Sequence, residues 1–196
     1  SRSPVLFPEV PAVAMRGGAA VRVVEHRGNG EDRNIKALYL RAIATATREV
    51  LISNPYLTDP DIIAALCAKA RQGVPVTIIT PQNNDFMPAQ YATRFYYQQL
   101  LDAGVRVFEY TGNDEEGRMA HQKVMIADDV VFSGSSNLDA RSLEYNRELN
   151  LVISDRDHAA QVRAKLFQVD LAQSDQVLEA DTGIREILSW MLSSFL

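Results

Sequence analysis

The chain has 196 residues, 46% of them hydrophobic, with a formal net charge of −5 and a single cysteine. This length and apolar content suit one domain with a substantial core. The acidic balance argues against DNA or RNA as the main partner, and the single Cys67 excludes a disulfide framework and a cysteine-based metal site. No run of 18 apolar residues occurs, so we expect no transmembrane segment.

Strand and helix patterns alternate along the chain after residues 1–19, whose Pro, Ala and Gly content predicts a linker or an extended arm. Residues 20–196 are predicted to form a single domain. In chain order we expect a strand at 21–24, a helix at 34–48, a strand at 50–52, a helix at 59–73, a strand at 74–79, a helix at 88–103 and a strand at 105–108. Strands at 119–126, 130–132 and 149–153 and helices at about 155–171 and 182–195 complete the pattern.

Repeated strand–helix–strand units of this length predict an α/β fold, with a mixed, mainly parallel sheet flanked by helices on both faces. The loops 82–87 and 111–119 follow predicted strands and are polar or contain glycine. Ligands of open α/β sheets bind at the carboxyl ends of the strands, so we expect a site at that edge. The chain begins with Ser1 and lacks an initiator methionine, which suggests a piece of a longer protein.

One short segment carries the groups that chemistry needs. His121 is followed by Lys123, then by Asp128, and then by a Gly-Ser-Ser-Asn run that ends at Asn137. Alternate residues of a strand share one face, so His121 and Lys123 are predicted to project side by side. A turn at Asp128 would return the second strand, and with it Asn137, to the histidine.

These side chains suit a phosphodiester. Lys123 and Asn137 can bind non-bridging phosphate oxygens and stabilise charge that develops in the transition state. His121 can attack phosphorus or donate a proton to the leaving alcohol. An ammonium group beside the histidine repels a cation, so we expect neither a metal nor another cofactor. Residues 81–150 hold 11 acidic and 6 basic residues, which argues against a groove for duplex phosphates.

Several other residues have simpler interpretations. Isolated histidines are usually structural or exposed, and we predict that His26 and His158 are solvated. Cys67 lies in an alanine-rich helical pattern and is predicted to be buried. Phe86 and Met87 follow a polar run, so they either belong to the core or line a path for acyl chains. The apolar face of the terminal helix is expected to pack on the domain, with contact to a membrane surface as the alternative.

The motif His-x-Lys-x4-Asp followed by Gly-Ser-x-Asn resembles that of the phospholipase D superfamily, and most of all that of the C-terminal half of bacterial cardiolipin synthases. The resemblance extends over residues 21–155 and includes the stretches 52–56, 96–105 and 137–142. One spacing differs, because five residues, 129–133, separate Asp128 from Gly134 where the family usually has six.

The resemblance implies a phosphatidyltransferase that acts on phospholipids such as phosphatidylglycerol through a phosphohistidine. In such enzymes two motif-bearing halves share one site, so the partner would be a missing N-terminal half or a second copy of the chain. The isolated chain would then be inactive. The parent protein would be cytoplasmic or peripheral on the inner face of a bacterial membrane, and nucleic acid would not be its partner.

The resemblance also implies roles for individual residues. His121, from a second half, would be the general acid and base, and Glu148 would hydrogen-bond it and fix its tautomer. Lys123, Asn137 and Asp128 complete the predicted catalytic set, although the motif aspartate of the family more often supports the hairpin. The predicted substrate-binding residues are Ser135, Ser136, Phe86 and Met87.

Two other functions remain open from the sequence. The chain can be a complete single-motif phosphodiesterase or nuclease that forms its site across a homodimer. It can also be a non-catalytic module that binds phosphate or lipid. The acidic motif region argues against the first alternative, and the intact set of His121, Lys123, Asn137 and Glu148 argues against the second.

Overall fold

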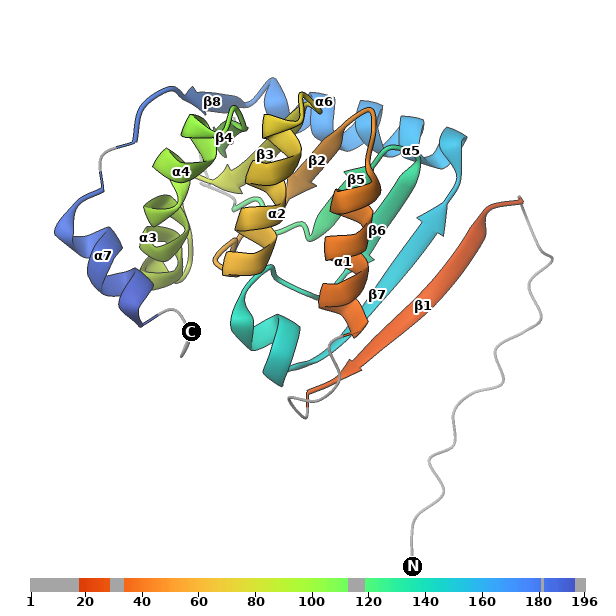
Figure 1. Ribbon diagram of the computed structural model, residues 1–196, viewed down its shortest axis with the longest axis horizontal. Coiled ribbons are helices and arrows are strands. Elements are labelled where there is room, and N and C mark those ends of the chain that lie inside the picture. Colours follow the sequence, from red (N-terminus) through yellow and green to blue (C-terminus); the bar gives the residue numbers. More distant parts are fainter. Residues whose placement is uncertain (1–17, 29–33, 113–118, 181, 193–196) are drawn as a thin grey trace, which may run out of the picture.

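The computed structural model describes residues 18–28, 34–112, 119–180 and 182–192. The described strands form one eight-stranded sheet, in the order β1-β7-β6-β5-β2-β3-β4-β8 (Figure 1). Their bounds are β1 (Ala20–Arg27), β2 (Val50–Ser53), β3 (Val76–Pro81), β4 (Arg106–Tyr110), β5 (Val124–Ala127), β6 (Val130–Gly134), β7 (Arg147–Ser154) and β8 (Ser174–Val177). The predicted arm at 1–19 lies almost wholly outside the described residues.

Helices cover both faces of this sheet (Figure 1). On one face lie α1 (Asn34–Thr45), α2 (Pro60–Arg71) and α4 (Tyr97–Asp102). On the other lie α5 (Arg156–Val162), η2 (Arg163–Phe167) and α6 (Gln168–Leu171). The remaining described helices are α3 (Met87–Phe95), η1 (Arg141–Tyr145) and α7 (Ile184–Met191).

The sheet is mixed, which confirms the predicted α/β class. However, β2–β3 and β3–β4 are the only parallel pairs among the described strands, and the other five neighbouring pairs are antiparallel. The expectation of a mainly parallel sheet is therefore wrong. Parallel neighbours need a crossover connection, and the helical crossovers α2 and α3–α4 join only β2, β3 and β4. From β5 onward the chain pairs through a hairpin and returning edge strands.

Several predicted elements differ in extent. The strand expected at 119–126 begins only at Val124, and the helix expected at 88–103 is divided at Tyr96 into α3 and α4. Strand β8 was not predicted, because its sequence, Ser-Asp-Gln-Val, is polar. It can be polar because it is an edge strand with no fully buried residue.

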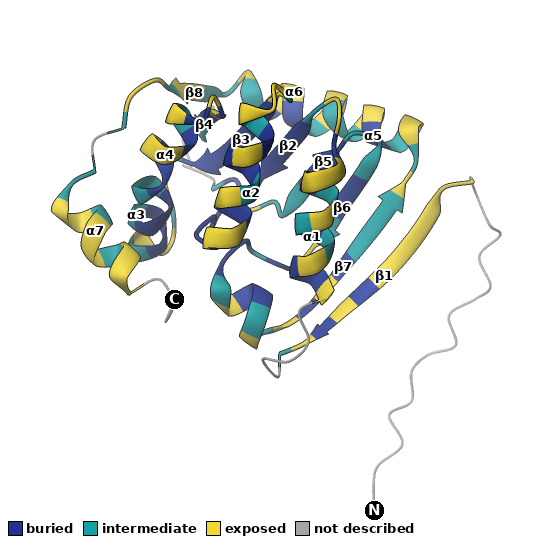
Figure 2. Cartoon of the chain, viewed as in Figure 1, coloured by how far each residue is buried: buried dark blue, intermediate teal, exposed yellow. Residues whose placement is uncertain are grey.

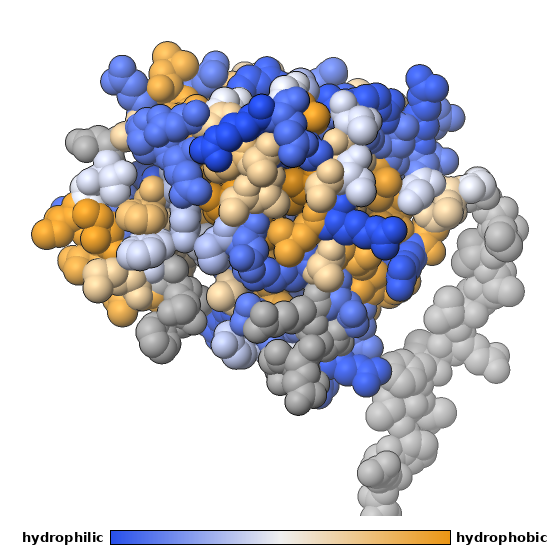
Figure 3. Space-filling view, viewed as in Figure 1, coloured by the Kyte–Doolittle hydropathy of each residue, from blue (hydrophilic) through white to orange (hydrophobic). Residues whose placement is uncertain are grey.

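The terminal helix α7 packs on α3. The ring of Trp190 stacks on that of Phe95 with 4.7 Å between centroids, and its Nε1 donates a hydrogen bond to Tyr96 Oη at 2.8 Å. Even so, α7 contributes several exposed apolar side chains, including Ile184 and Met191, and they form an apolar area at the left of Figure 3. None of the described helices is both long enough and apolar enough to cross a bilayer.

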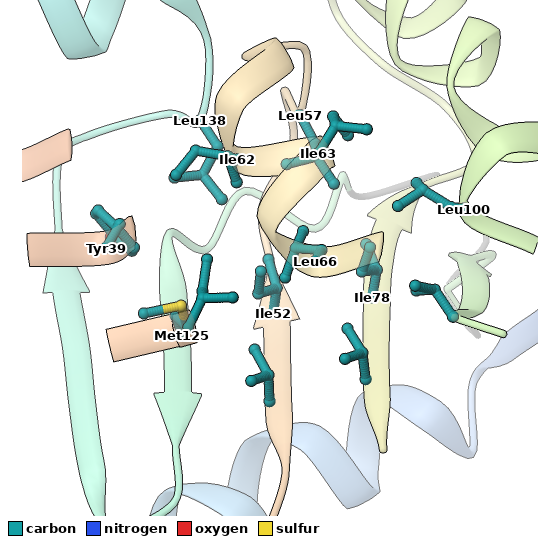
Figure 4. Packing of buried hydrophobic residues seen from close by; sticks show 14 of the residues in the cluster. Tyr39, Ile52, Leu57, Ile62, Ile63, Leu66, Ile78, Leu100, Met125 and Leu138 are labelled. Carbon is teal, nitrogen blue, oxygen red and sulfur yellow. The ribbon is translucent and has the colours of Figure 1, made fainter. Parts of the chain in front are cut away.

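The core lies between the sheet and its helices, so the central strands are dark blue along their length in Figure 2. Figure 4 shows Ile52 and Ile78 pointing from β2 and β3 toward Leu66 of α2. Leu51 and Ile79 face the opposite helices. Strands buried on both faces read as continuous apolar runs, and each such side chain contributes about 1.5–3 kcal/mol. Cys67 is buried in α2, as predicted.

The strand directions bring distant segments to one edge of the sheet. The carboxyl ends of β2, β3 and β6 lie at the edge where β5 and β7 begin. A parallel bridge joins Leu57, after β2, to Leu138, after β6. The backbone amides of Thr58 and Asp59 donate to Leu138 O at 2.9 and 3.0 Å. We call this edge the site edge.

Candidate active site

His121 and Lys123 immediately precede β5 at the site edge. Lys123 Nζ lies 3.1 Å from each ring nitrogen of His121 and donates to the His121 carbonyl oxygen at 3.1 Å. Gln122 points the other way and donates from Nε2 to Asp170 Oδ2 at 3.1 Å. The two motif side chains therefore lie side by side, although the backbone here precedes the paired strand.

The surroundings of His121 favour its neutral form. Partial removal from water lowers the pKa of the imidazole, the charge of Lys123 lowers it further, and Asp85 partly opposes both effects. Burial also lowers the pKa of the Lys123 ammonium, while Glu148, Asp139 and Asp85 act to raise it. A neutral imidazole can accept a proton at neutral pH, which a general base must do.

Glu148 lies at the start of β7 and is 8% exposed. Its carboxylate accepts hydrogen bonds from Ser135 Oγ and, at 3.4 Å, from Asn146 Nδ2. Ser135 Oγ also accepts from the Leu149 amide at 3.1 Å. Among the described contacts Glu148 therefore holds Ser135 and Asn146, and it acts on Lys123 through its charge. The predicted hydrogen bond, in which the His121 ring would donate to the Glu148 carboxylate, is not among these contacts.

The turn after β6 brings Asn137 to the site edge. A Cβ on Gly134 would collide with the backbone carbonyl oxygen of Leu149, so only glycine permits this approach of β6 to β7. Asn137 lines a cavity of about 300 Å³. Ser136, by contrast, is completely buried, and its amide donates to Asn150 Oδ1 at 3.3 Å. The prediction that Ser136 binds substrate does not fit this burial, because residue 136 points inward.

Asp128 lies at the opposite end of β5 from His121. Its carboxylate accepts hydrogen bonds from Thr47 N and Oγ1 at 2.9 and 3.0 Å, from Arg48 N at 2.8 Å and from Glu49 N at 3.1 Å. Burial alone would raise the pKa of Asp128, but these hydrogen bonds more than offset it and hold the pKa below its usual range. The structure therefore separates Asp128 from the other residues of the predicted catalytic set.

Two further residues stand beside His121. The Tyr56 ring lies edge-on to the imidazole with 6.5 Å between centroids, and its hydroxyl donates to Asp85 Oδ1 at 2.7 Å. Burial and the hydrogen bond to Asp85 both raise the pKa of Tyr56. The pair connects the loop after β2 to the loop after β3. Tyr56 also forms part of the wall of the Asn137 cavity.

The family model described as "Cardiolipin synthase, PLD-like domain" matches residues 39–170. The chain belongs to this family. It is 35% identical over 178 residues to cardiolipin synthase 2 of Bacillus cereus, a match that covers 88% of this chain and 34% of that protein. The chain thus spans about a third of the length of this relative.

Solved structures share the fold. Nuc, a phospholipase D family member from Salmonella typhimurium, matches with a TM-score of 0.68 at 24% identity, over 83% of this chain and 100% of that chain. Phosphatidylserine synthase from Haemophilus influenzae Rd KW20 matches with a TM-score of 0.71 at 15% identity, over 95% of this chain and 50% of that chain. At these identities the likeness shows the phospholipase D fold alone.

Four residues at the site edge are not among the predicted site residues: Tyr56, Asp85, Asp139 and Asn146. Tyr56 and Asp85 follow β2 and β3, at the strand ends where a ligand site was expected, so their position is the sequence signal that could have identified them. The predicted substrate contacts Phe86 and Met87 are 43% and 44% exposed. Phe86 lines the Asn137 cavity, whereas Met87 begins α3 and is not part of its wall.

The prediction for His26 was wrong. His26 is fully buried, and neither of its ring nitrogens has a hydrogen-bond partner within the described structure. The reason is that β1 continues to Arg27, so residue 26 pairs in register with Glu148 and faces the interior. His158 is partly exposed at the start of α5. No cluster of three or more His, Cys, Asp or Glu side chains that could hold a metal occurs in the described residues.

Proposed function

We propose that the chain is the C-terminal catalytic half of a phospholipase D-type phosphatidyltransferase that acts on phospholipid phosphodiesters. The observation that carries the proposal is the placement of His121 against Lys123 at the site edge, in a chain of the cardiolipin synthase family. Lys123 and Asn137 would bind the non-bridging phosphate oxygens, which places positive charge and a neutral donor where negative charge develops.

His121 would serve as the general acid and base. A histidine from the other half would attack phosphorus, and the leaving alcohol would take a proton from His121 as the P–O bond breaks. An acceptor hydroxyl would then give its proton to His121 and attack, which breaks the P–N bond and releases the partner histidine. The lowered pKa of His121 suits the second step, and a bound anionic phosphodiester would raise that pKa for the first.

Three observations support the proposal that the chain is one half of a larger enzyme that acts on lipids. The chain covers only 34% of a relative and aligns with 50% of the phosphatidylserine synthase chain. Phe86 lies exposed at the wall of the cavity. The outer face of α7 is apolar (Figure 3). We infer that a phosphatidylglycerol-like lipid is the substrate and that the parent protein acts at the inner face of a bacterial membrane.

A second candidate is a single-motif phosphodiesterase whose site forms between two copies of the chain. The observation that favours it is that the chain covers the full length of Nuc, a protein of comparable size with the same fold. In that arrangement His121 from each copy would face the same phosphodiester. Light scattering of the 196-residue chain, together with an assay for phosphodiester cleavage, separates the two candidates. A monomer without cleavage activity eliminates the second.

The main test is His121→Ala in the longer protein, assayed on phosphatidylglycerol vesicles with mass spectrometry of the lipid products. We expect transfer to fall by at least about 100-fold, since a positioned proton donor and acceptor contributes 10²–10⁴ in rate. His158→Ala is the matched control and should keep normal activity. His158 lies in α5, which follows the end of β7 that is opposite the site edge. Retention of transfer by folded His121→Ala protein would eliminate the proposed role.

A further inference from the structure

His26 is a buried polar side chain that the proposed mechanism does not use. It lies near the end of β1, is fully buried, and has no hydrogen-bond partner for either ring nitrogen within the described structure. A neutral imidazole has one N–H donor and one acceptor nitrogen. Leaving both unpaired in the interior is unfavourable, and an apolar side chain would avoid this effect. Proteins keep such unfavourable groups mainly at functional sites.

The residue opposite His26 is Glu148. Strands β1 and β7 are antiparallel, and residues 26 and 148 face each other in their register. Directly opposite residues point to the same side of a sheet, with Cβ atoms about 4.5–5.5 Å apart. Both side chains are buried, whereas the residues on either side of each are exposed or partly exposed along their strands. The imidazole and the carboxylate are therefore neighbours on the inner side of the sheet.

The chain directly after β1 also lies against the segment that leads to Glu148. Gly28 has a positive φ of 68°, and a Cβ at this position would collide with the backbone carbonyl oxygens of Tyr145 and Asn146. Only glycine permits this contact. Asn146 in turn donates from Nδ2 to Glu148 Oε1 at 3.4 Å. The end of β1 therefore approaches the surroundings of Glu148 through both its backbone and the His26 side chain.

We propose that His26 is a positioning residue, which donates a ring N–H to the Glu148 carboxylate and keeps that carboxylate ionised and in place. The inference rests on the proposed transfer reaction and adds a residue that acts through Glu148. His26 has a donor without an acceptor, and among the described contacts Glu148 Oε1 accepts only one long hydrogen bond. A small rotation of either side chain would pair the two, and a hydrogen bond to the charged form of a carboxyl favours that form.

The ionised carboxylate matters because of Lys123. Burial lowers the pKa of the Lys123 ammonium, and Glu148 is the first of the nearby charges that act to raise it. A protonated or displaced Glu148 would leave Lys123 more readily neutral. A neutral amine forms a weaker hydrogen bond to a phosphate oxygen than an ammonium does. His26 would therefore strengthen phosphodiester binding by Lys123 without touching the substrate.

The proposal predicts that His26 supports activity but not stability. His26→Leu replaces the unpaired ring with an apolar side chain, so the urea midpoint of the 196-residue chain should stay the same or rise. In the longer protein, transfer on phosphatidylglycerol vesicles should fall by roughly 10-fold or more, as when other residues that orient a functional group are removed. A purely structural role would lower the midpoint together with the transfer rate, and that result would overturn the proposal.

Two further comparisons test whether the effect passes through Glu148. His26→Gln keeps an N–H donor, so transfer should remain within about 3-fold of the wild type. In a Glu148→Gln background, His26→Leu should cause little further loss, because residues that act as one unit are not additive. His158→Leu, a partly exposed histidine of α5, is the matched control and should change neither the midpoint nor the transfer rate. Independent losses from His26→Leu and Glu148→Gln would contradict the assignment.

NMR of the histidine rings in the 196-residue chain tests the hydrogen bond without any reaction. A ring N–H that donates to a carboxylate forms a charge-assisted bond. We therefore expect the His26 N–H proton signal, identified by its loss in His26→Leu, to move upfield in Glu148→Gln. An unmoved signal would overturn the positioning role even if transfer occurs. If the longer wild-type protein forms neither transferred lipid nor phosphatidic acid, the proposed function fails, whereas the NMR shift still shows whether His26 donates to Glu148.

Discussion

The two ends of the β5–β6 hairpin belong to one sequence motif but are built in opposite ways. At the site edge, His121 is exposed and contacts a lysine whose own pKa is lowered. At the other end, Asp128 has a positive φ of 54° and accepts four hydrogen bonds from residues 47–49. One end leaves its polar groups available to a ligand, whereas the other satisfies them within the fold.

Within a single motif, one end is therefore available for substrate chemistry and the other end stabilises the hairpin. The loop before β2 donates to Asp128, and β2 itself pairs with β5, so the carboxylate fixes the hairpin to the centre of the sheet. Groups that must bind and release a substrate cannot form all their hydrogen bonds within the fold, because the substrate supplies some of the partners when it binds. Functional ends of a fold are therefore expected to contribute little to stability, and supporting ends to contribute most.

The largest expected effect is the difference in the free energy of unfolding between Asp128→Ala and His121→Ala, measured by urea denaturation. Alanine at 128 removes the acceptor of four hydrogen bonds and is strained at positive φ, so we expect a loss of about 3 kcal/mol. His121→Ala should change the free energy of unfolding by less than about 0.5 kcal/mol, as for other exposed sites. Asp128→Asn, which tolerates this φ and keeps one acceptor, should lie between them. Equal stabilities for the two alanine variants would contradict the idea that Asp128 stabilises the fold and His121 does not.

The same contrast explains what could be predicted from the sequence. The side-by-side placement of His121 and Lys123 depends on the local geometry of extended backbone, so a spacing of two residues was sufficient. The donors to Asp128 lie about 80 residues away in the sequence, and no local pattern connects them to it. Only the resemblance to a family suggested that this aspartate supports the hairpin.

Long-range pairing also accounts for the errors. The burial of His26 depends on its pairing with Glu148, from the far part of the chain, and the antiparallel majority depends on which strands become neighbours after β5. Helical crossovers were visible in the sequence and correctly placed β2, β3 and β4 in parallel. The partners of Glu148 depend on side-chain positions in the loop after β6, which periodicity does not determine.

A smaller effect on stability should come from Asp139, which, like Glu148, is a buried carboxylate at the site edge. Its folded pKa of about 6 lies above the ordinary value of 3.8, so the fold favours the protonated form. The corresponding stability is fully present below about pH 4 and is lost as the pH rises through 6. The shift corresponds to at most about 3 kcal/mol, and we expect Asp139→Asn to be about 2 kcal/mol more stable than the wild type at pH 8.

Thermal and urea unfolding at pH 5 and pH 8 check this prediction. The advantage of Asp139→Asn should shrink toward pH 5, because the wild-type carboxyl is then mostly protonated. Asp102→Asn, which removes an exposed carboxylate, should show no such pH dependence. A variant less stable than the wild type at pH 8 would mean that the Asp139 carboxylate is satisfied within the fold, as Asp128 is.

The smallest effect concerns the charge balance at His121 and leaves the fold unchanged. Lys123 lowers the pKa of the imidazole, so Lys123→Met should raise it. Asp85 acts in the opposite sense, so Asp85→Asn should lower it. Proton NMR of the ring hydrogens can follow both shifts, because the chain has three histidines and His121→Ala identifies the signal. Lys165→Met, in η2 on the opposite face of the sheet from α1 and α2, should leave the pKa of His121 unchanged.

If Lys123→Met also left the pKa of His121 unchanged, the two side chains would be adjacent without being electrostatically coupled. The site edge would then differ from the Asp128 end of the hairpin only in exposure.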